Sequence, residues 1–163
     1  MSPTIVELEK LLALLVTEHR ALSAAADVYQ KALRTFDLQQ INAGADAVEA
    51  CRAKIVMFEN RRRHQTLLVA RTHKLANDVT ISQIAQAVPA HRVNLVKYRD
   101  ELRKLTAEIT AKNSVSAKVA TAMMGHLNSV VRMVSGAVRQ AAVYTRYGQH
   151  TVAARVGVME AVA

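Results

Sequence analysis

Apolar residues recur along the first part of the chain at alternating three- and four-residue steps, the spacing of a long helix with one buried face. Ser2 and Pro3 suit the cap and the first position of that helix, because a proline there needs no hydrogen-bond partner. The pattern predicts one helix over residues 3–36. Its seam consists of Ile5, Leu8, Leu12, Leu15, His19, Leu22, Ala26, Tyr29, Leu33 and Phe36.

A second long helix is predicted over residues 38–76. Asp37 is its candidate N-cap, and its apolar stripe passes through Gly44 and Cys51 before a polar stretch begins at Glu59. A long amphipathic helix needs an apolar partner of similar length, so we expect this helix to pack against the first one.

A short helix and a last long helix follow. Thr80 is a candidate cap for a helix over residues 81–87, which ends before Pro89 because the residue preceding a proline avoids the helical region. The last helix is predicted over residues 90–138, and we expect it to pack against the first helix as well. Its heptad seam consists of Leu95, Tyr98, Leu102, Leu105, Ile109, Val119, Met123, Val130 and Met133, with polar interruptions at Lys112 and Ser116.

The C-terminal end of the sequence differs from the rest. It is small and aliphatic, and its apolar residues at i, i+4 and i+7 are Val152, Val156 and Met159. A helix there would be shorter than the ~12–15 residues that an isolated helix needs in water. The predicted organisation is therefore a helical bundle over residues 1–143 and an amphipathic tail over 144–163, mobile or loosely docked when free.

The composition supports helices throughout. The chain has 163 residues, of which 51% are hydrophobic but only 4% aromatic, with five glycines and two prolines to interrupt helices. The predicted fold class is all-α: an elongated antiparallel helical bundle or coiled-coil hairpin with three long helices, one short helix and the C-terminal amphipathic tail.

Neither a membrane span nor a secretory signal is expected. The longest aliphatic run, Leu11 to Val16, has six residues, against the roughly 20 that cross a bilayer. Glu7 and Glu9 occupy the region where a signal peptide would be basic and then apolar. These features predict a cytoplasmic protein.

Catalytic and cofactor motifs are not found in the sequence. The glycines are scattered, no Glu-x-x-His repeat occurs, and no two of the six histidines lie three or four residues apart. His19 and His126 fall on predicted seams, which favours structural imidazoles, and Cys51 reads as a small buried side chain. We predict no enzymatic activity, no cofactor and no metal site.

The net charge of +9 is unevenly distributed along the chain, which begins acidic and becomes basic in the middle. Residues 52–74 hold seven Lys or Arg and one Asp or Glu. Residues 1–51, in contrast, hold four Lys or Arg and seven Asp or Glu. The strongest basic feature consists of Arg61, Arg62, Arg63, Arg71 and Lys74. These residues fit a solvated helix face, an acidic protein partner or a nucleic acid, but no aromatic residue lies between Phe58 and Tyr98 to support nucleic-acid binding.

Several features follow one another in a fixed order along the chain: the leucine-rich first helix ending in Lys31-Ala-Leu33, the turn at Asp37, the basic second helix, Asn113 within the last helix, and Tyr144-x-x-x-Gly148 before the tail. Over nearly the whole chain, this ordered set resembles the FlgN-like flagellar export chaperones. The chain departs from the family pattern at Ser116, where a second asparagine is common, and in its high positive charge.

The resemblance implies a cytoplasmic chaperone that binds hook–filament junction (hook-associated) proteins before type III export. It places the cargo site on the tail, and we assign it to Tyr144, Tyr147, Val152, Val156 and Met159. For the basic residues, charge alone favours an acidic component of the export apparatus as partner. Two other readings stay open, a basic helical nucleic-acid-binding protein and a homo-oligomeric coiled-coil scaffold. The oligomeric state and the identity of the cargo are not set by the sequence.

Overall fold

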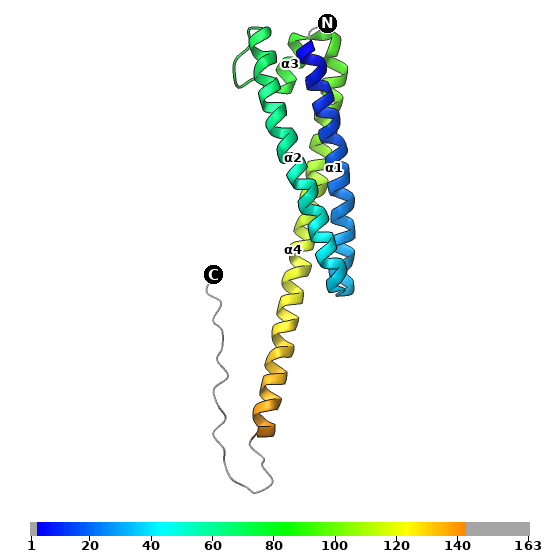
Figure 1. Cartoon of the computed structure of the whole chain (residues 1–163), viewed down its shortest axis with the longest axis vertical. Coiled ribbons are helices and arrows are strands. Elements are labelled where there is room, and N and C mark those ends of the chain that lie inside the picture. Colours follow the sequence, from blue (N-terminus) through cyan, green and yellow to red (C-terminus); the bar gives the residue numbers. More distant parts are fainter. Residues whose placement is uncertain (1–2, 143–163) are drawn as a thin grey trace. The chain divides into compact units, whose positions relative to one another are not determined.

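The computed structural model describes residues 3–142, and their side chains as far as Ala137. Within this range the chain forms helices α1 (Pro3–Thr35), α2 (Leu38–Thr72), α3 (Ile81–Ala87) and α4 (Arg92–Ala142), with a 3-10 turn, η1 (Pro89–His91), before α4 (Figure 1). No strand occurs among these residues. The predicted all-α bundle of three long helices and one short helix is confirmed.

The predicted helix starts are set by local hydrogen bonds. Asp37 caps α2 by accepting a hydrogen bond from the backbone N–H of Gln40 at 3.1 Å. Thr80 and Gln83 form a capping box at the start of α3, in which each side chain bonds the backbone N–H of the other residue. These caps lie where the sequence pattern places them, because capping depends only on residues a few positions apart.

The end of α2 differs from the prediction, since the helix stops at Thr72 and not near Ala76. Lys74 has a φ of 54°, and the N–H of Leu75 bonds the carbonyl of Ala70 at 2.8 Å. This is a Schellman ending, in which the left-handed position is usually glycine. Lysine fills it here, so the sequence carries no glycine to mark the stop.

The described residues divide into two units, residues 3–119 and residues 120–142. In the first unit, α1 supplies most of the core, and the seam predicted for it is buried at Ile5, Leu8, Leu12 and Leu15. Helix α3 closes one end by burying Ile84 and Ala85 against α1 and against Leu95 of α4. Burial of this continuous aliphatic surface is the main driving force for assembling the unit.

Helices α1 and α2 approach each other closely at Gly44. A Cβ on this buried residue would lie 3.1 Å from the Cα of Tyr29, which is tighter than ordinary van der Waals contact. Further along, the Gln65 side chain donates a hydrogen bond to the backbone carbonyl of Thr4 at 2.9 Å. The absence of a side chain at Gly44 therefore permits the close helix crossing.

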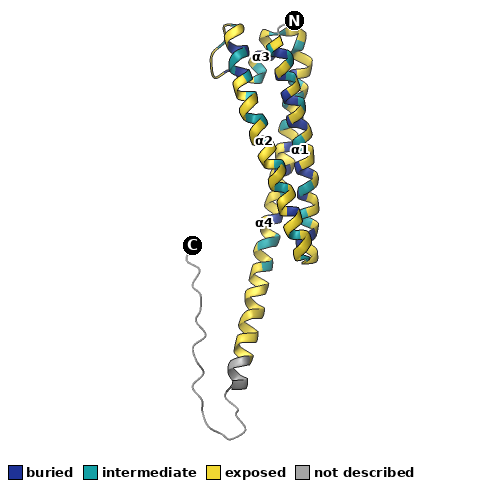
Figure 2. Cartoon of the chain, viewed as in Figure 1, coloured by how far each residue is buried: buried dark blue, intermediate teal, exposed yellow. Residues whose placement is uncertain are grey.

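Helix α4 has two different parts. In the first unit, its seam residues Leu95, Leu105 and Ile109 are buried. In the second unit, every described side chain from Met124 to Ala137 is exposed, as Figure 2 shows along the distal part of the helix. The prediction that Val130, Met133 and His126 lie on a buried seam is therefore wrong for this segment.

Helix lengths explain the difference in burial. Helix α4 has 51 residues, whereas α1 has 33, so a single pass of α1 cannot cover the whole seam of α4. No described helix has a stretch that is long and apolar enough to cross a membrane.

Candidate protein-binding surfaces

An exposed apolar stripe runs along the second unit. Met123, Leu127, Val130 and Val134 follow one another at i, i+4, i+7 and i+11, which places them on one face of α4. Leu127, Val130 and Val134 are 47%, 40% and 57% exposed. Flanking apolar side chains widen the face: Met124, Val131 and Met133. We call these seven residues the distal stripe.

The helix segment that carries the distal stripe has few charged residues. Residues 120–137 contain one cation, Arg132, and no Asp or Glu. Contiguous exposed apolar surface of this kind is uncommon on a soluble monomer and typically marks a binding surface. The sequence pattern did not predict this exposed surface, because the same spacing is typical of a buried core seam. The greater length of the last helix compared with the first could have indicated that part of its seam is exposed.

The basic residues predicted as a partner face separate into two groups. Arg61, Arg63, Arg71 and Lys74 are exposed, on the last turns of α2 and just beyond its end, and form no ion pair within the described part of the chain. Arg62 is different, because it is half-buried and its guanidinium bonds the Glu59 carboxylate at 2.9 and 3.0 Å. Four of the five cations are therefore available to an acidic partner.

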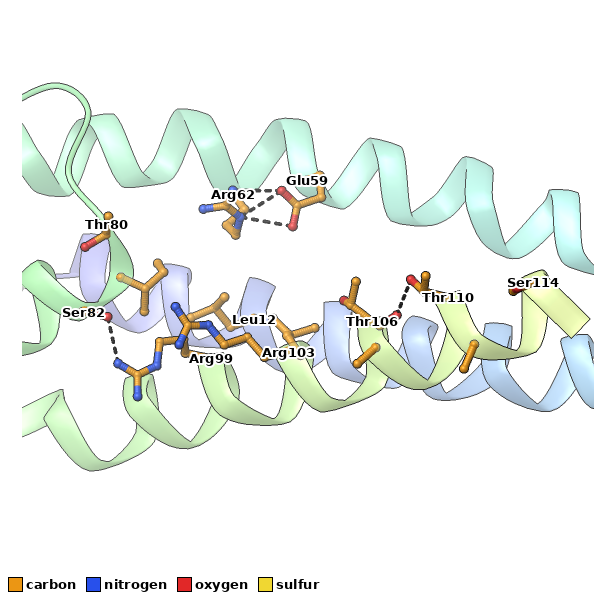
Figure 3. A pocket seen from close by; sticks show the side chains of 14 residues that line it. Leu12, Glu59, Arg62, Thr80, Ser82, Arg99, Arg103, Thr106, Thr110 and Ser114 are labelled. Carbon is orange, nitrogen blue, oxygen red and sulfur yellow. Dashed lines mark hydrogen bonds and ion pairs between the residues drawn. The ribbon is translucent and has the colours of Figure 1, made fainter.

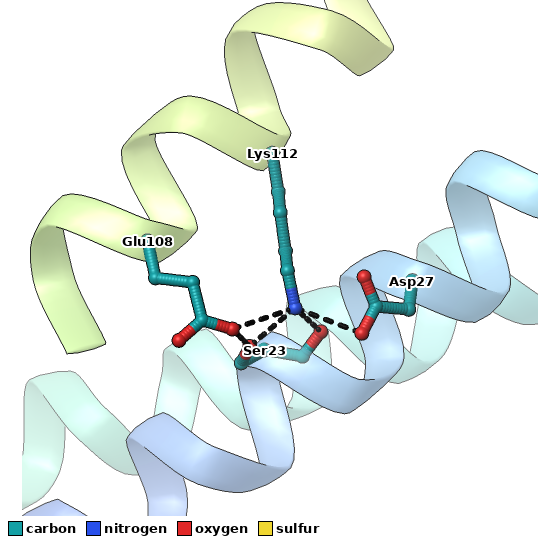
Figure 4. A network of polar contacts seen from close by, with 4 residues as sticks. All are labelled: Ser23, Asp27, Glu108 and Lys112. Atoms are coloured by element: carbon teal, nitrogen blue, oxygen red, sulfur yellow. Dashed lines mark hydrogen bonds and ion pairs between the residues drawn. The ribbon is translucent and has the colours of Figure 1, made fainter.

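The polar interruption of the α4 seam is a linked network between α4 and α1 (Figure 4). The Lys112 ammonium donates to the Ser23 hydroxyl at 2.7 Å and to the Asp27 carboxylate at 2.8 Å, and it lies 2.8 Å from Glu108. Ser23 in turn donates to Glu108 at 2.7 Å. Lys112 thus fixes the register of the two helices at a seam position that an apolar residue would otherwise occupy.

This network shifts two pKa values in opposite directions. Hydrogen bonds from Lys112 and then Ser23 lower the pKa of the Glu108 carboxyl below 4.5. Hydrogen bonds to Asp27 and then Glu108 raise the pKa of Lys112 above 10.5. Both groups are therefore held in their charged forms.

The remaining candidates, His19 and Cys51, are not part of a group of reactive side chains among the described residues. The His19 ring bonds the carbonyl of Leu15 through Nδ1 at 2.7 Å, as expected for a structural histidine. Cys51 is free and half-buried. Among the described side chains, no three His, Cys, Asp or Glu residues come together in a cluster that could hold a metal ion.

The predicted cargo residues Tyr144, Tyr147, Val152, Val156 and Met159 lie outside the described residues, as does the proposed boundary at 143/144. Their role stays a prediction.

Family comparison decides the class of protein. The model of the FlgN protein family matches residues 1–151 of the chain. The chain belongs to the FlgN family. This is a family of flagellar export chaperones, so the predicted resemblance is confirmed. A comparison with curated proteins and one with solved structures found no match.

Family membership gives the two exposed surfaces a context. An export chaperone binds other polypeptides, and an amphipathic helix face with exposed apolar side chains is a recurring kind of surface for such binding. The distal stripe has the exposure and the helical spacing that such a surface needs.

Proposed function

We propose that this protein is a cytoplasmic chaperone that binds hook–filament junction proteins and keeps them unassembled until export. The distal stripe is the observation that supports this proposal most directly. It offers an amphipathic helix face, with heptad-like spacing, to a partner helix of matching pattern. The terminal helices of hook-associated proteins, which need cover before assembly, are the proposed partners.

Apolar burial would provide most of the affinity. Each Å² of apolar surface removed from water contributes roughly 25 cal/mol, from which the cost of ordering the partner helix is subtracted. In this proposal the tail extends the same surface, with Tyr144 and Tyr147 as larger anchors and Val152, Val156 and Met159 as a second apolar face. The exposed cations Arg61, Arg63, Arg71 and Lys74 are assigned to an acidic export component.

The proposal is tested with a double variant on the distal stripe, Leu127→Asp with Val130→Asp. Because both side chains are exposed, the fold should survive, whereas an apolar helix interface would lose about tenfold or more in affinity for purified hook-associated proteins. Titration calorimetry measures the affinity, and circular dichroism checks the fold.

A matched control carries the same added charge on the opposite side of the helix, at Gly125→Asp with Gly136→Asp, both exposed and with open space for a side chain. This control should bind within about twofold of the unchanged chain. If the stripe variant and the control bind equally well, the distal stripe is not the cargo surface.

Truncation after Gln140 tests the tail separately. We expect the truncated chain to keep its thermal midpoint and to bind cargo more weakly. A chain that melts much earlier, or that binds cargo as tightly as the full chain, would show that the tail is not part of the cargo surface.

A further inference from the structure

A groove runs between α2 and α4 in the first unit, with α1 as its floor (Figure 3). It has a volume of about 860 Å³, and Leu12 of α1 lies at its base. Thr80 and Ser82, at the start of α3, stand at one end. The groove is distinct from the distal stripe, which belongs to the second unit.

The groove continues along α4. A second hollow of about 410 Å³ is lined by His19 and Leu22 of α1 and by Ile55 of α2, and it shares Thr106 and Thr110 of α4 with the first. We call the two together the α2/α4 groove. Its extent over several turns of both helices matches the shape of a helix and not that of a small molecule.

The short length of α3 explains why the groove is open. Helix α3 has seven residues and packs Ile84 and Ala85 into the core at one end of the unit. Past the first residues of α3, no other segment within residues 3–119 fills the space between α2 and α4. The first unit is therefore a four-helix arrangement in which one position is occupied for only two turns.

The α4 wall of the groove is lined by small side chains. Thr106, Ala107, Thr110, Ala111 and Ser114 follow one another along it. Small residues let the backbone of a second helix come close, and the half-buried side chains of Leu102 and Ile81 provide apolar surface for it to bury.

The groove is lined by more positively charged than negatively charged side chains. Both carboxylates on the α2 wall already have partners, since Glu59 is bonded by Arg62 and Glu49 lies 4.0 Å from Arg52. On the α4 wall, Arg99 bonds its neighbour Asp100 and donates to Ser82, but Arg103 is exposed and has no carboxylate partner among the described side chains. An occupant that brings carboxylates would therefore pair with the groove.

We propose that the α2/α4 groove binds an acidic amphipathic helix from a partner protein. Its apolar side chains would lie on Leu102 and Ile81, and its carboxylates would face Arg103 and Arg99. A second copy of this chain fits poorly, because the distal stripe segment 120–137 contains no carboxylate. The inference goes beyond the proposed chaperone activity and does not depend on which surface binds cargo.

The test uses the full chain and a fluorescein-labelled designed peptide of about 18 residues, roughly five helical turns, with a leucine stripe flanked by glutamates. Fluorescence anisotropy should show saturable binding that weakens with salt, since the arginine side chains are near the surface. A peptide with lysine at every glutamate position should bind about tenfold more weakly or not at all.

Two variants locate the site. Arg103→Glu should weaken binding about tenfold by replacing an attraction with a repulsion, and Ala107→Trp should weaken it comparably by filling the groove. The matched controls are Lys97→Glu on α4 and Ala50→Trp on α2, exposed residues that do not line the groove. Both controls should bind the peptide within about twofold of the unchanged chain.

Several results would overturn the proposal. They are no saturable binding of the acidic peptide, equal binding of the acidic and lysine peptides, or equal loss in Arg103→Glu and Lys97→Glu. Analytical ultracentrifugation could give a further contradicting result. If the unchanged chain sediments as a dimer and Ala107→Trp sediments as a monomer, the occupant of the groove is a second copy of the chain. Circular dichroism of each variant separates a lost site from a lost fold.

Discussion

The two parts of α4 have similar apolar spacing and opposite burial. Leu95, Leu105 and Ile109 in the first unit are 0%, 9% and 7% exposed, whereas Leu127 in the second unit is 47% exposed. A heptad pattern therefore shows that a helix face can be buried, but it does not show which chain buries it. In the first unit the partner is α1; for the second unit we propose that the partner is cargo.

The difference also distinguishes residues that stabilise the fold from residues that are free to bind. A buried side chain on α1 or proximal α4 contributes to folding, and its loss destabilises the protein. An exposed side chain on the distal stripe contributes little to folding and is available for binding.

The largest expected effect comes from a charge on the α1 seam. Leu15 is fully buried, so Leu15→Asp places an unpaired carboxylate in the core and should lower the free energy of unfolding by about 4 kcal/mol or more. Urea denaturation followed by circular dichroism measures it. The neighbouring Leu14 is 44% exposed, and Leu14→Asp should cost about 1 kcal/mol or less. Similar losses in both variants would contradict the assigned seam.

A smaller effect compares the two parts of α4 directly. Leu95→Ala should lower the free energy of unfolding by about 2–5 kcal/mol, because it leaves a cavity in the core. Leu127→Ala, the same change on the same helix, should alter it by about 0.5 kcal/mol or less. Chemical denaturation of both variants decides the matter. A large loss for Leu127→Ala would mean that the distal stripe is covered in the free protein.

The smallest expected effect is the pH dependence of the Lys112 network. The lowered pKa of Glu108 means that its contribution to stability is complete above its usual value of 4.5 and is lost as pH falls through the lower, folded-state value. The raised pKa of Lys112 means that its contribution is present below 10.5 and is lost as pH rises through the higher, folded-state value. The network should therefore stabilise the protein across the neutral range.

Glu108→Gln tests this dependence. Its thermal midpoint should fall less steeply than that of the unchanged chain as pH drops below 4.5, because the shifted carboxyl is gone. Glu49→Gln is the matched control, since its carboxylate is exposed and lies 4.0 Å from Arg52. Identical acid profiles for Glu108→Gln and the unchanged chain would show that Glu108 does not contribute.

Much of the fold could be predicted from local patterns. The start of α1 at Pro3 and the caps at Asp37 and Thr80 depend on residues within one helical turn, and the structure has them where predicted. The end of α2 could not be predicted from the sequence, because Lys74 adopts a left-handed conformation that lysine rarely takes. Gly44 was read only as part of a stripe, because its close contact with Tyr29 joins residues distant in sequence.

The candidate sites were less predictable for the same reason. The exposed cations at Arg61, Arg63 and Arg71 followed from charge alone, but the pairing of Arg62 with Glu59 required knowing which way each side chain points. The α2/α4 groove brings together residues from four helices, and no spacing along the chain signals it.

By itself, the sequence determined the helices, their starts, the α1 seam and the family, because each depends on short-range periodicity, on capping or on the order of motifs. Only the tertiary structure decided which half of the α4 seam is buried, how Lys112 is accommodated on it, and where a groove stays open. Burial is a property of packed neighbours: the same apolar residue is part of the core where α1 covers it and part of a binding surface where nothing in the described chain does.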